Sequence, residues 1–296
     1  MEKIKYIRQG DKGKLPTFAW KINNTCQYRC SYCFVDLEGE EDPQLSSIKK
    51  LVMLKLKKID EPFSMELLGG EPTLHPDYKD IVEEFIGFNN VKLLNIITNL
   101  KKDMSFWEDH IKHPKLVIQP SIHMEYLDKA LEEKLIYLNN NYTLMCNLMI
   151  HYDEKYNEKL KWILGVLSDL NIQYEISYLY DINNNKEVME YPTSIKEIVA
   201  NRDKPQASLK FFDEDKEYNY TVDEVYNNNL HHFLGWKCNT KYYTIDHKGY
   251  INRVCDVNST QHIVLFKGIS KIPLTCAQKS GCICDEYLEW EKWKDD

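Results

Sequence analysis

Three of the nine cysteines, Cys26, Cys30 and Cys33, lie close together near the start of the chain. Thiolates at this spacing can hold one face of a metal centre, and sulfur ligands favour zinc or iron–sulfur clusters. A structural zinc site needs a fourth ligand nearby, but the next Cys or His is His75. A cluster on three cysteines leaves one iron open to a further ligand. The spacing therefore favours an iron–sulfur centre, with zinc as the alternative.

A second motif, Gly69-Gly70-Glu71-Pro72, follows an apolar run further along the chain. Two adjacent glycines allow the backbone to approach a ligand closely. Glu71 and the backbone groups beside it are suited to hold an ammonium group. Taken alone, such a motif is in most cases an ordinary turn between a strand and a helix.

The last part of the chain carries five more cysteines, Cys238, Cys255, Cys276, Cys282 and Cys284. This segment is too small for a large apolar core, and small units of this kind are often held together by a metal. Five thiols suffice for one centre with four ligands, and the sequence does not identify the spare thiol. The isolated Cys146 lies within an apolar run and is predicted to be a small buried core residue.

The composition is that of a globular protein. The chain has 296 residues, of which 43% are hydrophobic and 28% charged, and this length allows a sizeable core. The net charge of −8 disfavours nucleic acid as a partner, because binding to phosphate backbones requires clustered Lys and Arg. No apolar run approaches the roughly 18 residues of a membrane span, and no secretion signal is present. We expect a cytoplasmic protein without a membrane partner.

The elements that position the motifs are β-strands alternating with helices. Strands are predicted at 17–22, 64–68, 91–98, 115–122, 143–150 and 173–180, and helices at 77–88, 126–138 and 154–170. This alternation indicates a parallel sheet with right-handed crossovers, curled into an open or partial barrel. The three early cysteines then follow the carboxyl end of the first strand, where barrel folds place their functional sites.

The pattern changes after residue 181, and we expect a domain boundary within 181–202. Residues 181–204 are polar and irregular. Further on, the sequence predicts two strands within 207–221 around the turn 213–216, a helix at 223–230, a hairpin of strands 241–245 and 250–254 with Gly249 at its turn, and a terminal helix at 286–293. The predicted domains are an N-terminal extension (1–15), a partial barrel (16–200) and a small cysteine-rich domain (201–296).

The early cysteine motif, with the aromatic Tyr32 before its third cysteine, resembles the cluster motif of the radical S-adenosylmethionine (SAM) superfamily. Gly69–Pro72 resembles the GGEP motif of that superfamily, and the order and separation of the two motifs also match. The resemblance covers about residues 16–181. It implies an α/β fold with a partial (β/α)6 barrel, a [4Fe–4S] cluster on the three cysteines, and SAM bound at the open iron.

The resemblance also implies cofactor contacts at the carboxyl ends of the strands. Thr98 and Asn99 match a pair near the methionine carboxylate or the ribose of SAM. The ends of the next two strands commonly supply polar contacts to the nucleoside. Those contacts would come from Ser121, His123 and either Asn147 or His151, for which solvent-facing strand ends are an equally good interpretation. The predicted cofactor-binding set is Tyr32, Gly69, Gly70, Glu71, Pro72, Thr98, Asn99, Ser121, His123 and Asn147.

The arrangement Cys238-x10-Gly249-x5-Cys255 resembles the opening of the SPASM/twitch domains that follow many radical SAM barrels. The chain departs from that pattern, because the gap after Gly249 is one residue longer than usual and the full SPASM cysteine set is absent. The resemblance therefore implies a twitch-like domain with one auxiliary [4Fe–4S] cluster on four of the five C-terminal cysteines. A structural zinc site with four cysteine ligands is the rival interpretation.

The function that the resemblance implies is reductive cleavage of SAM to a 5′-deoxyadenosyl radical. This radical abstracts a substrate hydrogen in an oxidation or a bond-forming modification. The expected partners are a peptide or a small polar metabolite and a flavodoxin- or ferredoxin-like electron donor. The short stretch before Cys26 disfavours a leader-peptide-binding or cobalamin domain in front of the barrel. The alternative function is a non-catalytic iron–sulfur or zinc-binding protein, and the sequence assigns no catalytic side chain.

Overall fold

The computed structural model describes residues 4–9, 15–33, 35, 37, 45–181, 187–188, 190–200, 208–213, 216–256, 258–279, 281–282 and 290–295. Its helices are α1 (Leu45–Leu56), α2 (Tyr78–Gly87), α3 (Met104–Glu108), α4 (Ala130–Asn141), α5 (Asn157–Asp169), α6 (Thr193–Ala200) and α7 (Val222–Asn227). None of the helices in these ranges has the length and apolar character that a membrane crossing requires.

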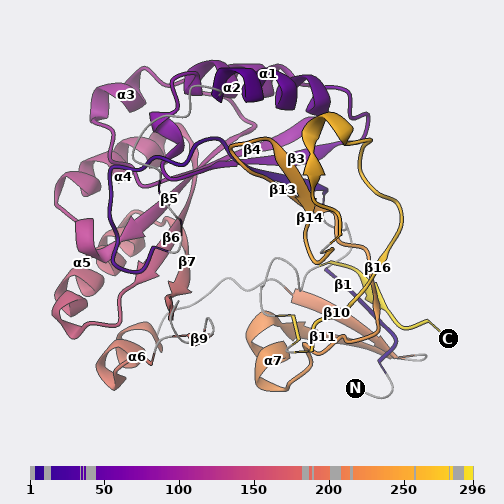
Figure 1. Ribbon diagram of the computed structural model, residues 1–296. Coiled ribbons are helices and arrows are strands. Elements are labelled where there is room, and N and C mark those ends of the chain that lie inside the picture. Colours follow the sequence, from indigo (N-terminus) through magenta and orange to yellow (C-terminus); the bar gives the residue numbers. More distant parts are fainter. Residues whose placement is uncertain are drawn as a thin grey trace.

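A nine-stranded sheet dominates the structure, in the order β15-β14-β13-β2-β3-β4-β5-β6-β7 (Figure 1). The strands are β2 (Thr17–Lys21), β3 (Phe63–Leu68), β4 (Val91–Thr98), β5 (Leu116–His123), β6 (Thr143–Ile150), β7 (Gln173–Tyr178), β13 (Tyr242–Ile245), β14 (Tyr250–Arg253) and β15 (Gln261–His262). Strands β2 to β7 are parallel in chain order, and β13 joins β2 in parallel. All six strands predicted before residue 181 are therefore confirmed.

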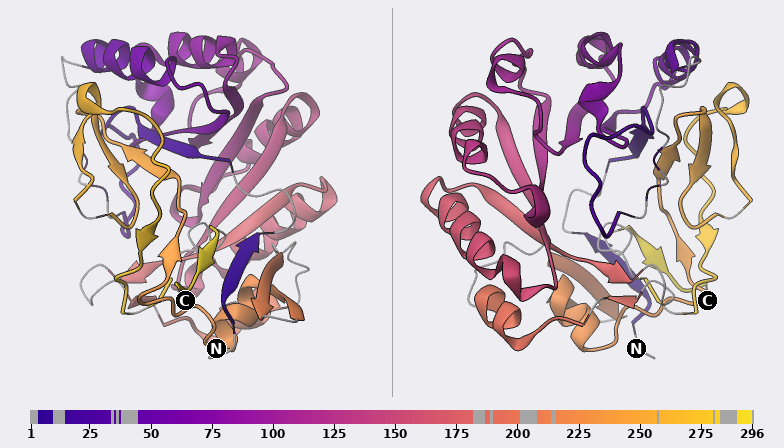
Figure 2. Two further views of the ribbon diagram at one scale, coloured as in Figure 1. Left: turned by 90° about the vertical axis from the view of Figure 1, so that its right-hand side faces the viewer. Right: turned by 60° about the vertical axis from the view of Figure 1, so that its left-hand side comes forward.

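The sheet buries one of its faces under helices because apolar residues alternate along its strands. In β5, for example, every second residue is buried (Leu116, Ile118, Pro120 and Ile122), whereas the residues between them are half-exposed. Trp20 of β2 packs edge-on against Phe85 of α2. Figure 2 shows α1, α2, α4 and α5 along the convex side of the curved sheet. The predicted α/β class is confirmed, and the description of this curved sheet as a partial barrel remains a prediction.

A second, six-stranded sheet has the order β11-β10-β1-β17-β12-β16. Its strands are β1 (Tyr6–Gln9), β10 (Ser208–Asp213), β11 (Lys216–Thr221), β12 (Lys237–Cys238), β16 (Leu274–Thr275) and β17 (Lys292–Trp293), and β8 (Tyr180–Asp181) pairs separately with β9 (Glu187–Val188). Strand β1 pairs with both β10 and β17, so the two ends of the chain lie side by side (Figure 1). The predicted hairpin, β13–β14, extends the main sheet instead.

Two predictions for the second half of the chain are wrong. The terminal helix predicted at 286–293 is contradicted where the structure describes it, since Lys292 and Trp293 form β17; residues 286–289 lie outside the described residues. Backbone pairing with strands on both sides sets the extended conformation there. The segment predicted to be irregular contains α6, which buries Ile195 and Val199 at helical spacing. The predicted strand pair β10–β11, the helix α7 and the turn at Gly249 (φ 81°) are confirmed.

A buried histidine under the main sheet makes the stability of the fold depend on pH. Tyr78 Oη donates to His110 Nε2 at 2.9 Å, and His110 Nδ1 donates to the Ile111 carbonyl at 3.1 Å. Burial lowers the pKa of His110 to about 4, below the value of about 6.5 in an unfolded chain. The folded state therefore disfavours the charged form. Stability is complete above pH 6.5 and falls by at most about 1.4 kcal/mol per pH unit as the pH drops towards 4.

We expect the free energy of unfolding of the wild type to fall by about 2 kcal/mol more between pH 7 and pH 5 than that of His110→Gln. Urea unfolding at the two pH values measures the difference. The lost hydrogen bond lowers the stability of the variant equally at both values, so it does not affect the comparison. His75, whose pKa burial also lowers to about 4, provides a second variant, His75→Gln. Equal pH dependence in all three proteins would contradict the prediction.

Candidate functional site

The cysteine loop, residues 22–33, follows β2 and packs against the glycine motif after β3. Gly70 N donates to the Asn23 carbonyl at 3.3 Å, and Glu71 N donates to the Thr25 carbonyl at 2.7 Å. The two motifs therefore meet at the carboxyl ends of adjacent parallel strands, as the sequence predicts.

The two glycines are required by the close packing of these loops. A Cβ atom on Gly69 would lie 2.4 Å from Asn23 Oδ1, and one on Gly70 would lie 2.2 Å from the Thr25 carbonyl oxygen. Only a residue without a side chain fits at such distances. In the described structure the close approach is to the cysteine loop itself, and the predicted cofactor contact of this motif remains a prediction.

Glu71 is buried, with 1% of its surface exposed. Its carboxylate links the segment after β3 to the end of β4 through hydrogen bonds. Its Oε1 accepts from Thr73 N, from Thr73 Oγ1 at 2.6 Å and from Thr98 Oγ1 at 2.8 Å, while Oε2 accepts from Asn99 N at 2.7 Å. Burial raises the pKa of this carboxyl, and the hydrogen bonds oppose the rise. The arrangement holds Asn99 so that its Nδ2 lies 3.6 Å from Cys26 Sγ. A contact of Glu71 with an ammonium group would share oxygens that already accept protein donors.

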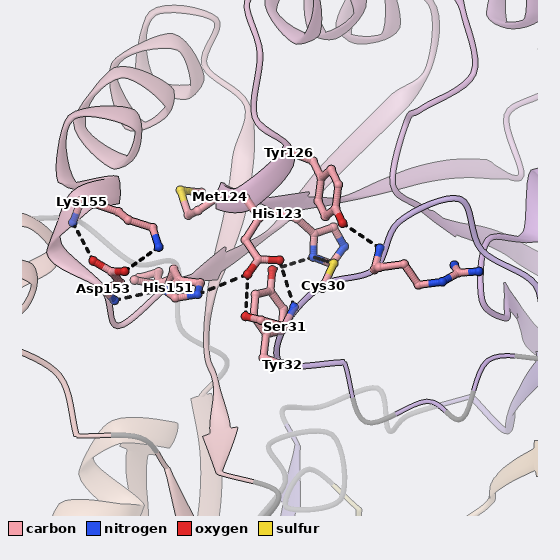
Figure 3. Close-up of polar contacts among 12 residues, drawn as sticks. Cys30, Ser31, Tyr32, His123, Met124, Tyr126, His151, Asp153 and Lys155 are labelled. Atoms are coloured by element: carbon pink, nitrogen blue, oxygen red, sulfur yellow. Dashed lines mark hydrogen bonds and ion pairs between the residues drawn. The ribbon is translucent and has the colours of Figure 1, made fainter.

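Cys30, Tyr32 and His123 lie together where the loop crosses the end of β5 (Figure 3). Tyr32 Oη is 2.8 Å from His123 Nδ1, and Cys30 Sγ is 3.6 Å from the same nitrogen. Burial lowers the pKa of His123 to about 4 and raises the pKa of the Cys30 thiol to about 12. Cys30 therefore carries its proton in the metal-free protein, and a metal must displace that proton on binding.

The short 3₁₀ helix Met124–Tyr126 forms hydrogen bonds with the other side of the cysteine loop. Glu125 accepts from Ser31 N at 3.0 Å and from Ser31 Oγ at 2.5 Å, and Tyr126 Oη accepts from Arg29 N at 2.8 Å. His151, at the end of β6, lies 3.5 Å from Glu125 Oε1 (Figure 3). Neither Glu125 nor Tyr126 was predicted to be a site residue. Their only sequence signal is their position directly after a predicted strand.

A pocket that is open to solvent, with a cavity volume of about 40 Å³, lies beside the cysteine loop. Three predicted cofactor residues, Asn99, Ser121 and His123, line it together with Lys101 and Lys134. Its aromatic wall is formed by Tyr28 and Tyr126, whose rings stack with centroids 3.9 Å apart. The structure therefore brings these three residues to one place. Thr98 and Glu71 lie behind Asn99 in the hydrogen-bonded network described above.

The uncovered face of the sheet carries a polar row formed by Glu66, Asn95, Gln119 and Asn147. Asn95 Nδ2 donates to Gln119 Oε1, and Gln119 Nε2 donates to Asn147 Oδ1 at 3.0 Å. Glu66 accepts a 2.6 Å hydrogen bond from Tyr242 of β13. All four side chains of the row are half-exposed. Asn147, predicted as a nucleoside contact, thus belongs to the row and does not line the pocket.

Four of the C-terminal cysteines come together around β12. Cys276 N donates to the Trp236 carbonyl at 2.8 Å, and Cys282 N donates to the His231 carbonyl at 2.8 Å. The pKa of Cys282 is raised to about 12, chiefly by burial and to a smaller extent by the charges of Cys238, Cys255 and Cys276, so each of these three thiols lies within electrostatic reach of Cys282. Cys255 adopts a positive φ of 65°. Cys284 lies outside the described residues.

The two cysteine sets offer donors suited to iron–sulfur clusters or zinc, because both sets consist of sulfur alone. Among the described residues, no three His, Cys, Asp or Glu side chains are arranged as ligands to a single metal ion. A four-iron cluster binds its cysteines at separate corners, so the thiols around it need not converge on one point. The donor chemistry therefore fits a cluster in each set. Cys146 is fully buried, as predicted, and its thiol belongs to the main core.

No family model matches the chain. Part of the chain is similar to GTP 3′,8-cyclases, with 28% identity over 96 residues to that of Haemophilus influenzae (strain PittGG) and 29% identity over 98 residues to that of Edwardsiella ictaluri. The matches cover 29% and 30% of this chain. They span only 28% and 29% of the lengths of the two cyclases.

The fold is similar to those of two solved enzymes. Streptococcus suis SuiB aligns with a TM-score of 0.55 and 14% identity over 84% of this chain and 63% of SuiB. The enzyme anSMEcpe with bound AdoMet and Kp18Cys peptide aligns with a TM-score of 0.50 and 14% identity over 92% of this chain and 80% of its own. Both are radical SAM enzymes. The chain therefore has the fold of the radical SAM enzymes, which confirms the resemblance predicted from its motifs.

Proposed function

We propose that the protein is a radical SAM enzyme, with a [4Fe–4S] cluster on Cys26, Cys30 and Cys33 and SAM in the pocket beside them. The observation that carries the proposal is the direct contact between the cysteine loop and the Gly69–Pro72 motif, which includes the 2.7 Å bond from Glu71 N to the Thr25 carbonyl. Two motifs that are distant in sequence share one site. When bound, the cluster and SAM supply a 5′-deoxyadenosyl radical, the chemistry that the cofactor brings.

The side chains around the pocket then bind and orient the nucleoside. The stacked rings of Tyr28 and Tyr126 provide an apolar surface, while Asn99 and Ser121 provide hydrogen-bonding groups at the same pocket. Glu71 keeps Asn99 in place through its backbone N–H.

We further propose that the curved sheet is a partial (β/α)6 barrel within residues 16–200 and that residues 201–296 form a twitch-like domain. Cys238, Cys255, Cys276 and Cys282 would hold one auxiliary [4Fe–4S] cluster. Cys238, Cys255 and Cys276 each act electrostatically on the thiol of Cys282, which supports a centre shared by these four cysteines. A zinc site on the same four thiols remains the rival. The pairing of β1 with β10 places part of the predicted N-terminal extension in the same sheet as the C-terminal strands.

The substrate we propose is a peptide or a small polar metabolite. One SuiB structure contains its precursor peptide SuiA, and the anSMEcpe structure contains a peptide as well. The polar row on the uncovered face of the sheet offers a carboxylate from Glu66 and amides from Asn95, Gln119 and Asn147. These groups suit hydrogen bonds to either class of substrate. A flavodoxin- or ferredoxin-like protein as electron donor and a cytoplasmic location complete the proposal.

We expect anaerobically reconstituted and reduced protein to convert SAM into methionine and 5′-deoxyadenosine. Chromatography of the nucleoside product measures the conversion, and the same protein without reductant is the control. Iron-loaded protein that forms no product above this control would be a non-catalytic iron–sulfur protein, the alternative function. Protein that takes up zinc but no iron would contradict the cluster itself.

A further inference from the structure

The side chain of Asn99 lies between the turn after β4 and the cysteine loop. Its Oδ1 accepts hydrogen bonds from Lys101 N at 3.0 Å and from Gln27 Nε2 at 3.2 Å. Its Nδ2 lies 3.6 Å from Cys26 Sγ. Because Gln27 directly follows Cys26, this one amide group contacts two successive residues of the loop.

The orientation of the Asn99 amide follows from its partners. A backbone N–H can only donate, so the amide atom that faces Lys101 N is the oxygen. The NH₂ group of the same amide therefore faces Cys26. Cys26 Sγ also accepts a hydrogen bond from Tyr28 N at 3.4 Å. Two N–H donors, one from a side chain and one from the backbone, thus meet a single sulfur atom.

The turn that presents Asn99 has an unusual backbone conformation. Leu100 has a φ of 54°, in the left-handed region that is costly for a residue with a side chain. Leu100 N donates to Thr98 Oγ1 at 3.2 Å, and the Leu100 carbonyl accepts from Lys134 Nζ of α4 at 2.9 Å. Such conformations persist where the surrounding contacts enforce them, and they are concentrated at functional sites. The contacts of Leu100 fix the direction of the Asn99 side chain beside it.

Glu71 supports the same turn from the other side. Its Oε2 accepts from Asn99 N at 2.7 Å, and its Oε1 accepts from Thr98 Oγ1 at 2.8 Å. The backbone and the amide oxygen of Asn99 are therefore both held by protein groups. Its NH₂ group is directed at Cys26, a cysteine that we propose as a cluster ligand.

A hydrogen bond to a cysteine sulfur becomes stronger when that sulfur carries charge. A thiol is a weak acceptor, whereas hydrogen bonds to ionised groups are roughly twice as strong as those between neutral groups. A cysteine binds metal as the thiolate, and hydrogen bonds to the sulfur atoms help to set the reduction potential of an iron–sulfur cluster. Reduction adds negative charge, so a donor at a ligand sulfur stabilises the reduced state more than the oxidised state.

We infer that Asn99 donates a hydrogen bond to the thiolate of Cys26 and thereby raises the reduction potential of the first cluster. The inference rests on the proposed function, which places this cluster on Cys26, Cys30 and Cys33. Asn99 is a positioning residue in this role, since its amide acts on the cluster through Cys26. A higher potential makes the cluster easier for its electron donor to reduce.

The test is a redox titration of the full-length, iron-loaded protein in the absence of SAM, so that a contact with the nucleoside cannot contribute. The electron paramagnetic resonance signal that is absent from Cys30→Ala identifies the first cluster, even beside a second cluster. At a fixed applied potential, we expect the ratio of reduced to oxidised first cluster to be about tenfold lower in Asn99→Ala. This ratio corresponds to a shift of about 59 mV for a one-electron couple.

Asn99→Asp is a second variant of nearly the same shape. Its carboxylate keeps an acceptor for Lys101 N and Gln27 Nε2, but the oxygen that replaces the NH₂ group cannot donate to Cys26. We expect its ratio of reduced to oxidised cluster to be lower still, because the carboxylate adds negative charge beside the sulfur. The titration follows only the iron-loaded fraction, so a lower yield of either variant does not affect the comparison.

Gln27→Ala is the matched control. The Gln27 side chain is exposed and meets the oxygen of the same amide. The variant therefore removes one contact between Asn99 and the cysteine loop but leaves the donor to Cys26 in place. We expect its ratio of reduced to oxidised first cluster to match that of the wild type.

The outcomes separate the role of Asn99 from the proposed function. An unchanged potential in Asn99→Ala overturns the hydrogen bond to Cys26 and leaves the cluster standing. Equal decreases in Asn99→Ala and Gln27→Ala also overturn it, because the effect would then come from the packing of the loop. A wild-type protein with no signal beyond that of Cys30→Ala overturns the first cluster and the inference together.

Discussion

The Cys30→Ala variant is expected to form no more 5′-deoxyadenosine than the unreduced wild type, whereas Cys146→Ala is expected to keep the wild-type rate. Cys30 lies on the loop that we propose to hold the cluster, beside Tyr32 and His123. Removal of its thiol leaves two protein ligands for a cluster that already has one open iron. Such a cluster is not retained, because thiolate ligation is what holds it.

The Cys146→Ala variant is a matched control because it also removes a thiol, but at a position outside the cysteine loop. Cys146 lies on β6 with no exposed surface, packed in the main core. Burial raises the pKa of its thiol to about 12, so it is an unreactive core residue. Iron content and product formation are measured for both variants under anaerobic reduction. Wild-type product formation by Cys30→Ala, or its loss in Cys146→Ala, would contradict the assignment of the cluster to the early cysteines.

Much of the main sheet could be predicted from the sequence because its signals are local. The alternation of buried and more exposed residues in β5 and in β6 identifies strands without knowledge of their partners. The same strand pattern also predicted that the cysteine motif and the Gly69–Pro72 motif lie at the carboxyl ends of adjacent strands. For the site, the sequence predicted that Asn99, Ser121 and His123 lie near one another at the strand ends, and the structure places all three around one pocket beside the cysteine loop.

The missed features depend on contacts between distant parts of the chain. Strand β17 is extended because it pairs with β1 and β12, and a six-residue window that contains two tryptophans gives no sign of those partners. Glu125 binds the cysteine loop through Ser31, yet in the sequence it is an ordinary acidic residue after a strand. Asn147 lies in the polar row and does not line the pocket, and its predicted contact with the cofactor remains a prediction.

Replacement of Gly70 by Ala is expected to destabilise the protein by about 1–3 kcal/mol, the usual cost of overpacking, and to reduce iron retention at the first cluster. The new Cβ would lie 2.2 Å from the Thr25 carbonyl oxygen and 3.1 Å from Cys26 Cβ. The cysteine loop must therefore move away from β3. That movement breaks the 2.7 Å hydrogen bond from Glu71 N to the Thr25 carbonyl and displaces Cys26, the first of the three cluster ligands that we propose.

Gly165→Ala provides the matched control for this variant. Gly165 lies inside α5, and a Cβ atom there would meet nothing within 4 Å. Since Ala is favoured over Gly in a helix interior by about 1 kcal/mol, this variant is expected to be more stable than the wild type and to retain its iron. Urea unfolding and iron analysis measure both effects. If Gly70→Ala matched Gly165→Ala in stability and iron content, the close packing of the two loops could not be what positions the cluster ligands. The glycine motif would then act only through the cofactor.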